Sequence, residues 1–164
     1  MIKQNLFTFI SFTLLILSAV IYFLKAKIFL DPDFGWSLRL GELILKNGIP
    51  DRDPFSYTMP SYPYVDYEWL THVGMAKLYS FSGYVGLAFI FTLIAIIPII
   101  ICVWDSDSRF APLQILFATA TLFSYFGIRS QVVSWLLFAI LSKTVIDDTW
   151  WRGYKYFLSK TLKT

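Results

Sequence analysis

Residues Leu6 to Leu24 read LFTFISFTLLILSAVIYFL, a run of 19 residues without a charged side chain. A helix needs about 20 apolar residues to cross the hydrocarbon core of a bilayer. A secretory signal peptide would have a shorter apolar core, of about 7–15 residues, and a small-residue cleavage site after it. Here the run ends in Leu24-Lys25-Ala26-Lys27, which lacks such a site. We therefore interpret residues 1–30 as an amino-terminal segment with a retained transmembrane helix.

Three further apolar segments lie in residues 85–146. Val85 to Trp104 reads VGLAFIFTLIAIIPIIICVW, and the segments Phe110 to Ile128 and Gln131 to Ile146 follow it. The composition agrees with these spans, because 57% of the residues are hydrophobic and 15% are charged, against about 45–50% and 25% in soluble domains. The single cysteine, Cys102, excludes an internal disulfide, and a net charge of +3 without a basic tract argues against a nucleic-acid partner.

The sequence thus predicts an all-α integral membrane protein with about four transmembrane helices in the lipid bilayer. A long outer loop, residues 31–84, is expected to carry two short amphipathic surface helices, and residues 147–164 form a basic tail. The tail contains Arg152, Lys155, Lys160 and Lys163. Since Lys and Arg concentrate on the cytoplasmic side, we expect both termini in the cytoplasm and the loop outside the plasma membrane.

Helix signals in the loop define its two expected helices. The first is predicted from Phe34 to Lys46, because Asp31-Pro32-Asp33 resembles a helix start and Asn47-Gly48 a helix stop. Its apolar stripe of Trp36, Leu40, Leu43 and Ile44 has helical spacing and is expected to rest on the membrane surface. The second is predicted from Tyr67 to about Phe81, with Asp66 as its cap and Gly83 as its end.

The acidic residues of the loop have two interpretations each. Asp31 and Asp33 either cap a helix or form a carboxylate pair that acts as a base or binds a divalent cation. Glu68 and His72 are four residues apart and either form a solvated polar face or reach one metal ion. Arg129, at the outer end of a span, either snorkels to the interface or pairs with an anionic lipid group. The candidate metal ligands are therefore Asp31, Asp33, Glu68 and His72.

Several stretches, taken together, resemble a known family. They are Asp31-Pro32-Asp33-Phe34-Gly35-Trp36-Ser37-Leu38-Arg39-Leu40-Gly41-Glu42, Gly48-Ile49-Pro50, Asp53-Pro54-Phe55-Ser56-Tyr57-Thr58, Asp66-Tyr67-Glu68-Trp69-Leu70, and Arg129-Ser130-Gln131 with Ser134-Trp135-Leu136-Leu137-Phe138. The chain resembles the amino-terminal part of bacterial polytopic membrane proteins related to the C-type glycosyltransferases, which use sugars linked to polyprenyl phosphate.

The resemblance implies a sugar transfer at the outer membrane face from a polyprenyl-phosphate-linked donor. A catalytic acid is expected at the start of the loop, where Asp31 and Asp33 stand. The remaining substrate-binding candidates are the possible phosphate partners Arg39, Arg52 and Arg129, the aromatic residues Trp36, Tyr64 and Trp69, and the acids Asp66 and Glu68. The alternative function is a non-catalytic membrane subunit whose outer loop docks a lipid or a protein partner.

Overall fold

The computed structural model describes residues 2–59, 61–104 and 106–145, with side chains from residue 5 onward. Five helices follow one another in this part of the chain: α1 (Ile2–Ile28), α2 (Phe34–Asn47), α3 (Trp69–Val103), α4 (Ala111–Phe123) and α5 (Ser130–Val145). The segment between α2 and α3 forms turns and an isolated antiparallel bridge between Arg52 and Pro63. The predicted all-helical fold is therefore confirmed. The predicted tail at 147–164, and Ile146, lie outside the described residues.

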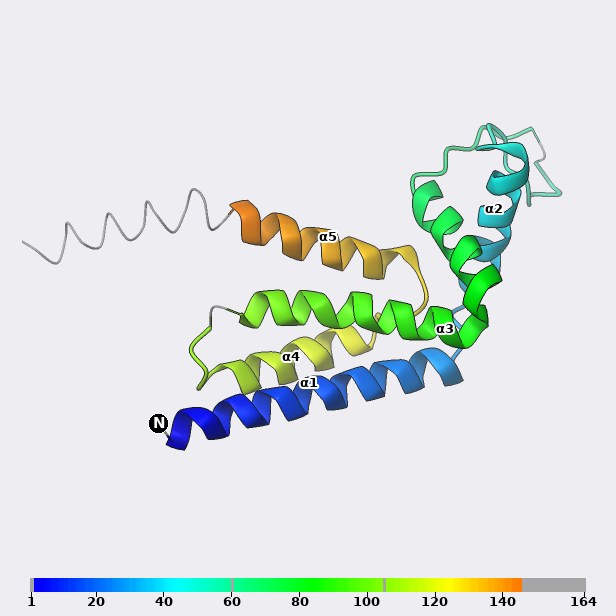
Figure 1. The fold of residues 1–164 in the computed structure, drawn as a ribbon. Helices are drawn as coiled ribbons and strands as arrows, with labels where there is room; N and C mark the ends of the chain where they lie inside the picture. The colour runs from blue at the N-terminus through cyan, green and yellow to red at the C-terminus, as the bar shows by residue number, and fades with distance from the viewer. Residues whose placement is uncertain (1, 60, 105, 146–164) are drawn as a thin grey trace, which may run out of the picture.

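The helices form a layer with a lobe at one end (Figure 1). In the layer, the second part of α3 lies between α5 on one side and α1 with α4 on the other. The lobe consists of residues 31–59 and 61–82, and it contains α2 and the first part of α3. The carboxyl end of α1 and the amino end of α5 both lie at the lobe end of the layer. Residues far apart in the sequence are therefore brought together where the lobe joins the layer.

Two helices, α1 from Asn5 to Ile28 and α3, are long and apolar enough to cross a membrane. Helix α4 has 13 residues and α5 has 16. At about 1.5 Å per residue they reach about 20 and 24 Å, less than the hydrocarbon core of about 30 Å. The expectation of four full-length spans is therefore not supported by the helix lengths.

The predicted third span ends early for a physical reason. Helix α4 stops at Phe123, where Lys25 of α1 donates hydrogen bonds to the carbonyl oxygens of Phe123 and Ser124. A helix end leaves its last carbonyl groups without helical partners, and a basic side chain can satisfy them. The chain then turns and stacks the Phe126 ring on Tyr22 at 4.6 Å between ring centroids. This turn carries Arg129 to the lobe end of the layer.

Helix α2 has the predicted bounds to within one residue, but its buried face is rotated from the predicted stripe. Leu40 and Ile44 are buried as expected, whereas Trp36 is 41% exposed. The buried side also contains Phe34, Ser37 and Gly41, because α2 packs on the first part of α3. A β-carbon on Gly41 would lie 2.0 Å from the backbone oxygen of His72. Only glycine therefore permits this approach of the two helices.

Helix α3 combines the predicted second loop helix and the predicted second span. Gly83, at which the loop helix was expected to end, has non-helical angles of φ 64° and ψ −170° inside α3. A positive φ of this kind suits glycine, which has no β-carbon. Gly83 thus separates the lobe part of α3 from the part that lies in the helical layer (Figure 1).

Candidate functional site

Two aspartates occupy equivalent positions before the two lobe helices. The Asp31 Oδ1 atom accepts a hydrogen bond from the backbone N–H of Asp33 at 3.0 Å. In the same way, the Asp66 Oδ1 atom accepts one from the N–H of Glu68 at 2.9 Å. Helices α2 and α3 begin only after these turns, at Phe34 and Trp69. The two aspartates therefore stabilise the turn that precedes each helix. Each aspartate keeps its second oxygen for another partner.

The second oxygen of Asp31 binds Arg129, which stands directly before α5. The Arg129 Nε and Nη2 atoms donate to Asp31 Oδ2 at 2.7 and 2.6 Å. The Asp31 side chain is 7% exposed and that of Arg129 is 27% exposed. A β-carbon on Gly127 would lie 2.2 Å from Asp31 Oδ2. Arg129 thus pairs with an acid of its own chain, a partner that the sequence interpretation did not include.

The second oxygen of Asp66 binds His72, one turn into α3. Asp66 Oδ2 lies 2.9 Å from His72 Nδ1, and both side chains are 2% exposed. The other ring nitrogen, Nε2, is buried and has no hydrogen-bond partner. It faces Glu68 Oε2 at 3.6 Å, which is too long for a hydrogen bond. The Trp36 ring meets the imidazole edge to face, with 5.4 Å between the ring centroids.

A pocket of 190 Å³ lies where these groups meet. It is lined by four of the predicted site residues, Asp33, Trp36, Glu68 and Arg129. Three further lining residues are Ser37, Ser130 and Gln131. The pocket therefore combines the start of α2, the residue before α3 and the start of α5. Segments nearly 100 residues apart contribute to one polar cavity.

The charges around the pocket do not balance. The side chains of Asp33 and Glu68 are 70% and 51% exposed. The only described cation that lines the pocket, Arg129, already binds Asp31 and lies 3.9 Å from Asp33 Oδ2. The lining thus contains two carboxylates and one guanidinium that already has a partner, which favours a cation, or an anion that arrives with a cation.

Other predicted site residues lie outside the pocket lining. Arg39 pairs with Glu42 at 2.8 Å on the exposed side of α2. Arg52 is exposed and forms the isolated bridge. Trp69 is the first residue of α3, and Asp66 is buried beside His72. Arg129 is thus the predicted phosphate-binding arginine that the fold brings to the pocket.

Tyr64 lies next to the pocket without lining it. Its ring packs edge to face on Trp36, with 6.4 Å between the centroids. Burial, with the negative charges of Asp66, Asp53 and Glu68, raises the pKa of the Tyr64 hydroxyl to about 12. The hydroxyl therefore stays protonated in alkaline solution as well as at neutral pH, and it remains a hydrogen-bond donor. Tyr64 supports Trp36 in the position where the indole lines the pocket.

The sequence interpretation missed the role of three polar residues and one pair. Ser37 is one helical turn after Asp33, and this spacing of four was the available signal. Ser130 and Gln131 adjoin Arg129, but only the fold shows that the start of α5 faces the lobe. The pairing of Asp66 with His72 had a spacing of six, which no simple helical pattern predicts.

The four predicted metal ligands do not form a single metal centre. Within residues 2–59, 61–104 and 106–145, no three His, Cys, Asp or Glu residues come together as possible ligands. Asp31 is removed from the set for a clear reason, because its two oxygens bind Arg129 and the backbone of Asp33. Glu68 and His72 remain as neighbours.

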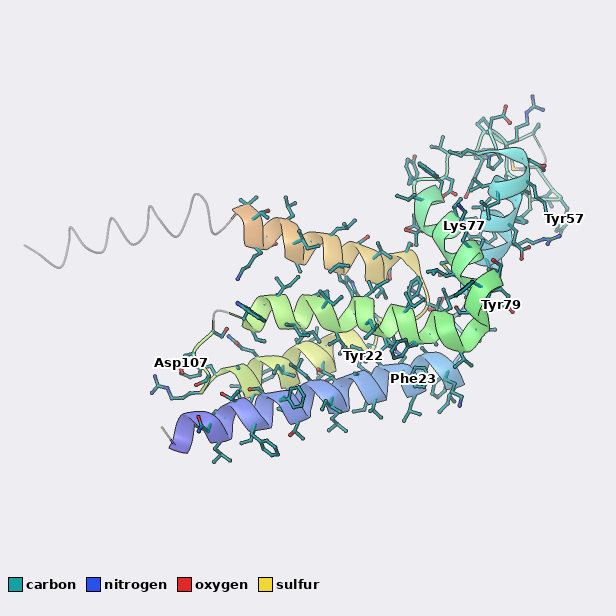
Figure 2. The ribbon with its side chains drawn as sticks, viewed as in Figure 1. Tyr22, Phe23, Tyr57, Lys77, Tyr79 and Asp107 are labelled. Atoms are coloured by element: carbon teal, nitrogen blue, oxygen red, sulfur yellow. The ribbon has the colours of Figure 1, made fainter. Side chains whose placement is uncertain are left out.

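The pocket lies between the two ends of the molecule. Figure 2 shows Tyr57 at the outer edge of the lobe and Asp107 at the opposite end of the helical layer. The pocket's lining residues come from both the lobe and the layer.

Comparison of the chain with protein-family models, with curated proteins and with solved structures gives no match.

Proposed function

We propose that this chain forms part of a membrane glycosyltransferase that transfers a sugar from a polyprenyl-phosphate donor at the outer face of the membrane. The observation that supports this proposal is the pocket itself. Three stretches that resemble the family, at residues 31–42, 66–70 and 129–131, each contribute to its lining. Sugar transfer of this kind requires a base, a phosphate partner and an aromatic surface in one place, and the pocket contains all three types of residue.

Asp33 is the base in this proposal. Its carboxylate lines the pocket and is largely exposed, and its nearest cation, Arg129, is 3.9 Å away. Asp31 is a positioning residue, because its own carboxylate is occupied by Arg129 and by the turn before α2. Trp36 offers a face on which a sugar ring can stack. Arg129 keeps part of its guanidinium accessible for a phosphate oxygen.

The transfer is a single displacement at the anomeric carbon. The Asp33 carboxylate accepts the proton of the acceptor hydroxyl as its oxygen bonds to that carbon. The bond from the anomeric carbon to the phosphate oxygen breaks, and the electron pair leaves on the phosphate. Positive charge near the phosphate stabilises the departing group. The configuration at the anomeric carbon inverts.

The proposed membrane arrangement places the helical layer in the bilayer of the plasma membrane. Helices α1 and α3 cross it, and the shorter helices α4 and α5 lie beside them in the layer. Both termini then lie in the cytoplasm and the lobe lies outside. This arrangement puts the pocket at the outer surface, where a polyprenyl donor presents its sugar.

The test measures consumption of tritium-labelled polyprenyl-phosphate hexoses by membranes that contain the full chain in its natural context. Asp33→Asn keeps the shape of the side chain but removes its basicity, so we expect transfer to fall about 10²-fold or more. Asp107→Asn is the matched control, since it changes the same chemical group at the far end of the layer. Unchanged transfer in Asp33→Asn at equal protein levels would exclude Asp33 as the base.

A second proposal, a docking subunit, is favoured by the exposed aromatic residues of the lobe. Tyr57 is 93% exposed and Tyr67 is 89% exposed. Aromatic side chains that stand free on a surface are frequent at contacts with proteins and lipid headgroups. Membranes that bind a partner through Tyr57 and Tyr67, but consume no labelled donor, would favour this function over sugar transfer.

A further inference from the structure

His72 is the only histidine of the chain, and its Nε2 atom is a buried polar group without a partner. Buried polar atoms are nearly always hydrogen-bonded, so an exception calls for a physical explanation. A carboxylate only accepts hydrogen bonds, and Asp66 accepts at 2.9 Å from His72 Nδ1. The hydrogen of a neutral imidazole is therefore on Nδ1. In that form Nε2 carries a lone pair, and it lies 3.6 Å from Glu68 Oε2.

This arrangement is the one that metal-binding histidines use. Such a histidine usually donates its second ring N–H to a carboxylate, which fixes the ring and makes the other nitrogen a better ligand. Asp66 occupies that position and is itself held by the N–H of Glu68 at 2.9 Å. The ring is further fixed by Trp36, at 5.4 Å between centroids.

The distance between the two nearest ligand atoms also fits. His72 Nε2 and Glu68 Oε2 are 3.6 Å apart. A divalent transition metal binds imidazole nitrogen and carboxylate oxygen at about 2.0–2.2 Å, so an ion between them would subtend an angle of about 120°. Glu68 lines the pocket and is half exposed, so the ion can enter from the pocket side.

We propose that His72 and Glu68 bind a divalent transition-metal ion through Nε2 and the carboxylate, with Asp66 as the positioning residue. The remaining ligands are water and the phosphate oxygens of the donor, a part of the proposal that rests on the proposed function. The pocket carries more carboxylates than cations, so a phosphate next to Asp33 and Glu68 needs such an ion. A mixed set of imidazole and carboxylate suits Zn²⁺ or Mn²⁺ better than Mg²⁺.

The metal is tested directly, without any sugar transfer. The full chain is purified in detergent with ¹⁵N-labelled histidine, and Zn²⁺ is titrated while the single imidazole is followed by NMR and the bound metal by elemental analysis. We expect Zn²⁺ to shift the His72 Nε2 resonance. Glu68→Gln should weaken Zn²⁺ binding at least 10-fold, and Asp66→Asn by about 10–100-fold. Glu42→Gln, an exposed acid of α2 that pairs with Arg39, should leave the affinity unchanged.

A Nε2 resonance that Zn²⁺ does not move, or equal affinity in Glu68→Gln and the unaltered chain, would overturn the metal site. Because Glu68 is half exposed, this variant should retain the helix content of the parent chain. Farnesyl phosphate, a soluble lipid phosphate, serves as the second probe. It should tighten Zn²⁺ binding several-fold. Metal binding that farnesyl phosphate does not change would retain the ion but reject its role with the donor phosphate.

Discussion

Each end of the helical layer contains an ion pair between an aspartate and an arginine, but the two pairs differ in their surroundings. At the lobe end, Asp31 accepts a hydrogen bond from the N–H two residues later at 3.0 Å and binds Arg129 Nη2 at 2.6 Å. At the far end, Asp107 accepts from the N–H of Arg109 at 3.0 Å and binds its Nη2 at 2.6 Å. These two distances agree, although Arg129 Nε donates to one oxygen of Asp31 and Arg109 Nε donates to both oxygens of Asp107. The partners are 98 residues apart in the first pair and two in the second.

The difference lies in burial and in what each pair connects. The far pair is open to water, with side chains 43% and 66% exposed. Hydrogen bonds from the Arg109 side chain lower the pKa of the Asp107 carboxyl to about 2, but two side chains only two residues apart can meet without any tertiary contact. The lobe pair joins the start of α2 to the start of α5, so only the folded chain can form it. Equal contacts therefore have unequal effects on the fold.

The two ends also differ in how their helices pack. At the lobe end, Gly41 and Gly127 allow backbone and carboxylate to approach closely. At the far end, α3 and α5 leave a groove of 390 Å³ between them, lined mainly by apolar residues such as Ile100 and Ile140. The pocket at the lobe end is thus lined mainly by polar side chains, whereas the groove at the far end is lined mainly by apolar ones.

The largest expected contrast between the two ends is their accessibility, which should be all or none. In a Cys102→Ser background, a cysteine at Ser61 in the lobe should react with an impermeant thiol reagent on intact cells. A cysteine at Asp107 should react only after the cells are permeabilised. The reason is the proposed orientation, with the ends on opposite faces of the membrane. The reverse pattern of labelling would overturn that orientation.

Packing at the lobe end should respond strongly to one methyl group. In Gly41→Ala, the new β-carbon would lie 2.0 Å from the backbone oxygen and 2.5 Å from the backbone carbon of His72. Backbone atoms cannot move aside as a side chain can, so α2 and α3 must separate, which costs about 3 kcal/mol. The measurement is thermal unfolding in detergent.

Gly35 provides the control on the same helix. A β-carbon there has no neighbour within 4 Å, so Gly35→Ala should be neutral or stabilise α2 by about 0.5–1 kcal/mol through helix propensity. Equal unfolding temperatures for the Gly35→Ala and Gly41→Ala variants would show that α2 does not pack on α3 as described.

The two ion pairs themselves should give the smallest contrast. Asp31→Asn leaves the partly buried Arg129 without its charged partner and should destabilise the fold by about 1–3 kcal/mol. Asp107→Asn, in the exposed pair, should leave the unfolding temperature unchanged within error. A double-mutant cycle with Arg129→Gln isolates the pair. No coupling between the two lobe substitutions would remove the distinction drawn between the two ends.

The sequence alone determined the features that depend on neighbouring residues. The run from Leu6 to Leu24 lies inside α1, α2 ends at Asn47-Gly48 as predicted, and Gly83 marks the break in α3. These features are local, because helix length, caps and glycine conformation act over a few residues. They were therefore predictable before any contact was known. Asp33, Trp36, Glu68 and Arg129, which line the pocket, were also among the candidate residues named from the sequence.

Only the tertiary structure decided which of the acids are free. Asp31 and Asp33 look equivalent in the sequence, but Arg129 reaches Asp31 because α4 ends at Phe123 and the chain turns there. Asp66 looked like a simple cap, but it also holds His72 at 2.9 Å. These outcomes depend on contacts between segments up to 98 residues apart. Periodicity and capping rules contain no information on such contacts, because the pairing of distant charges is set by how the helices pack.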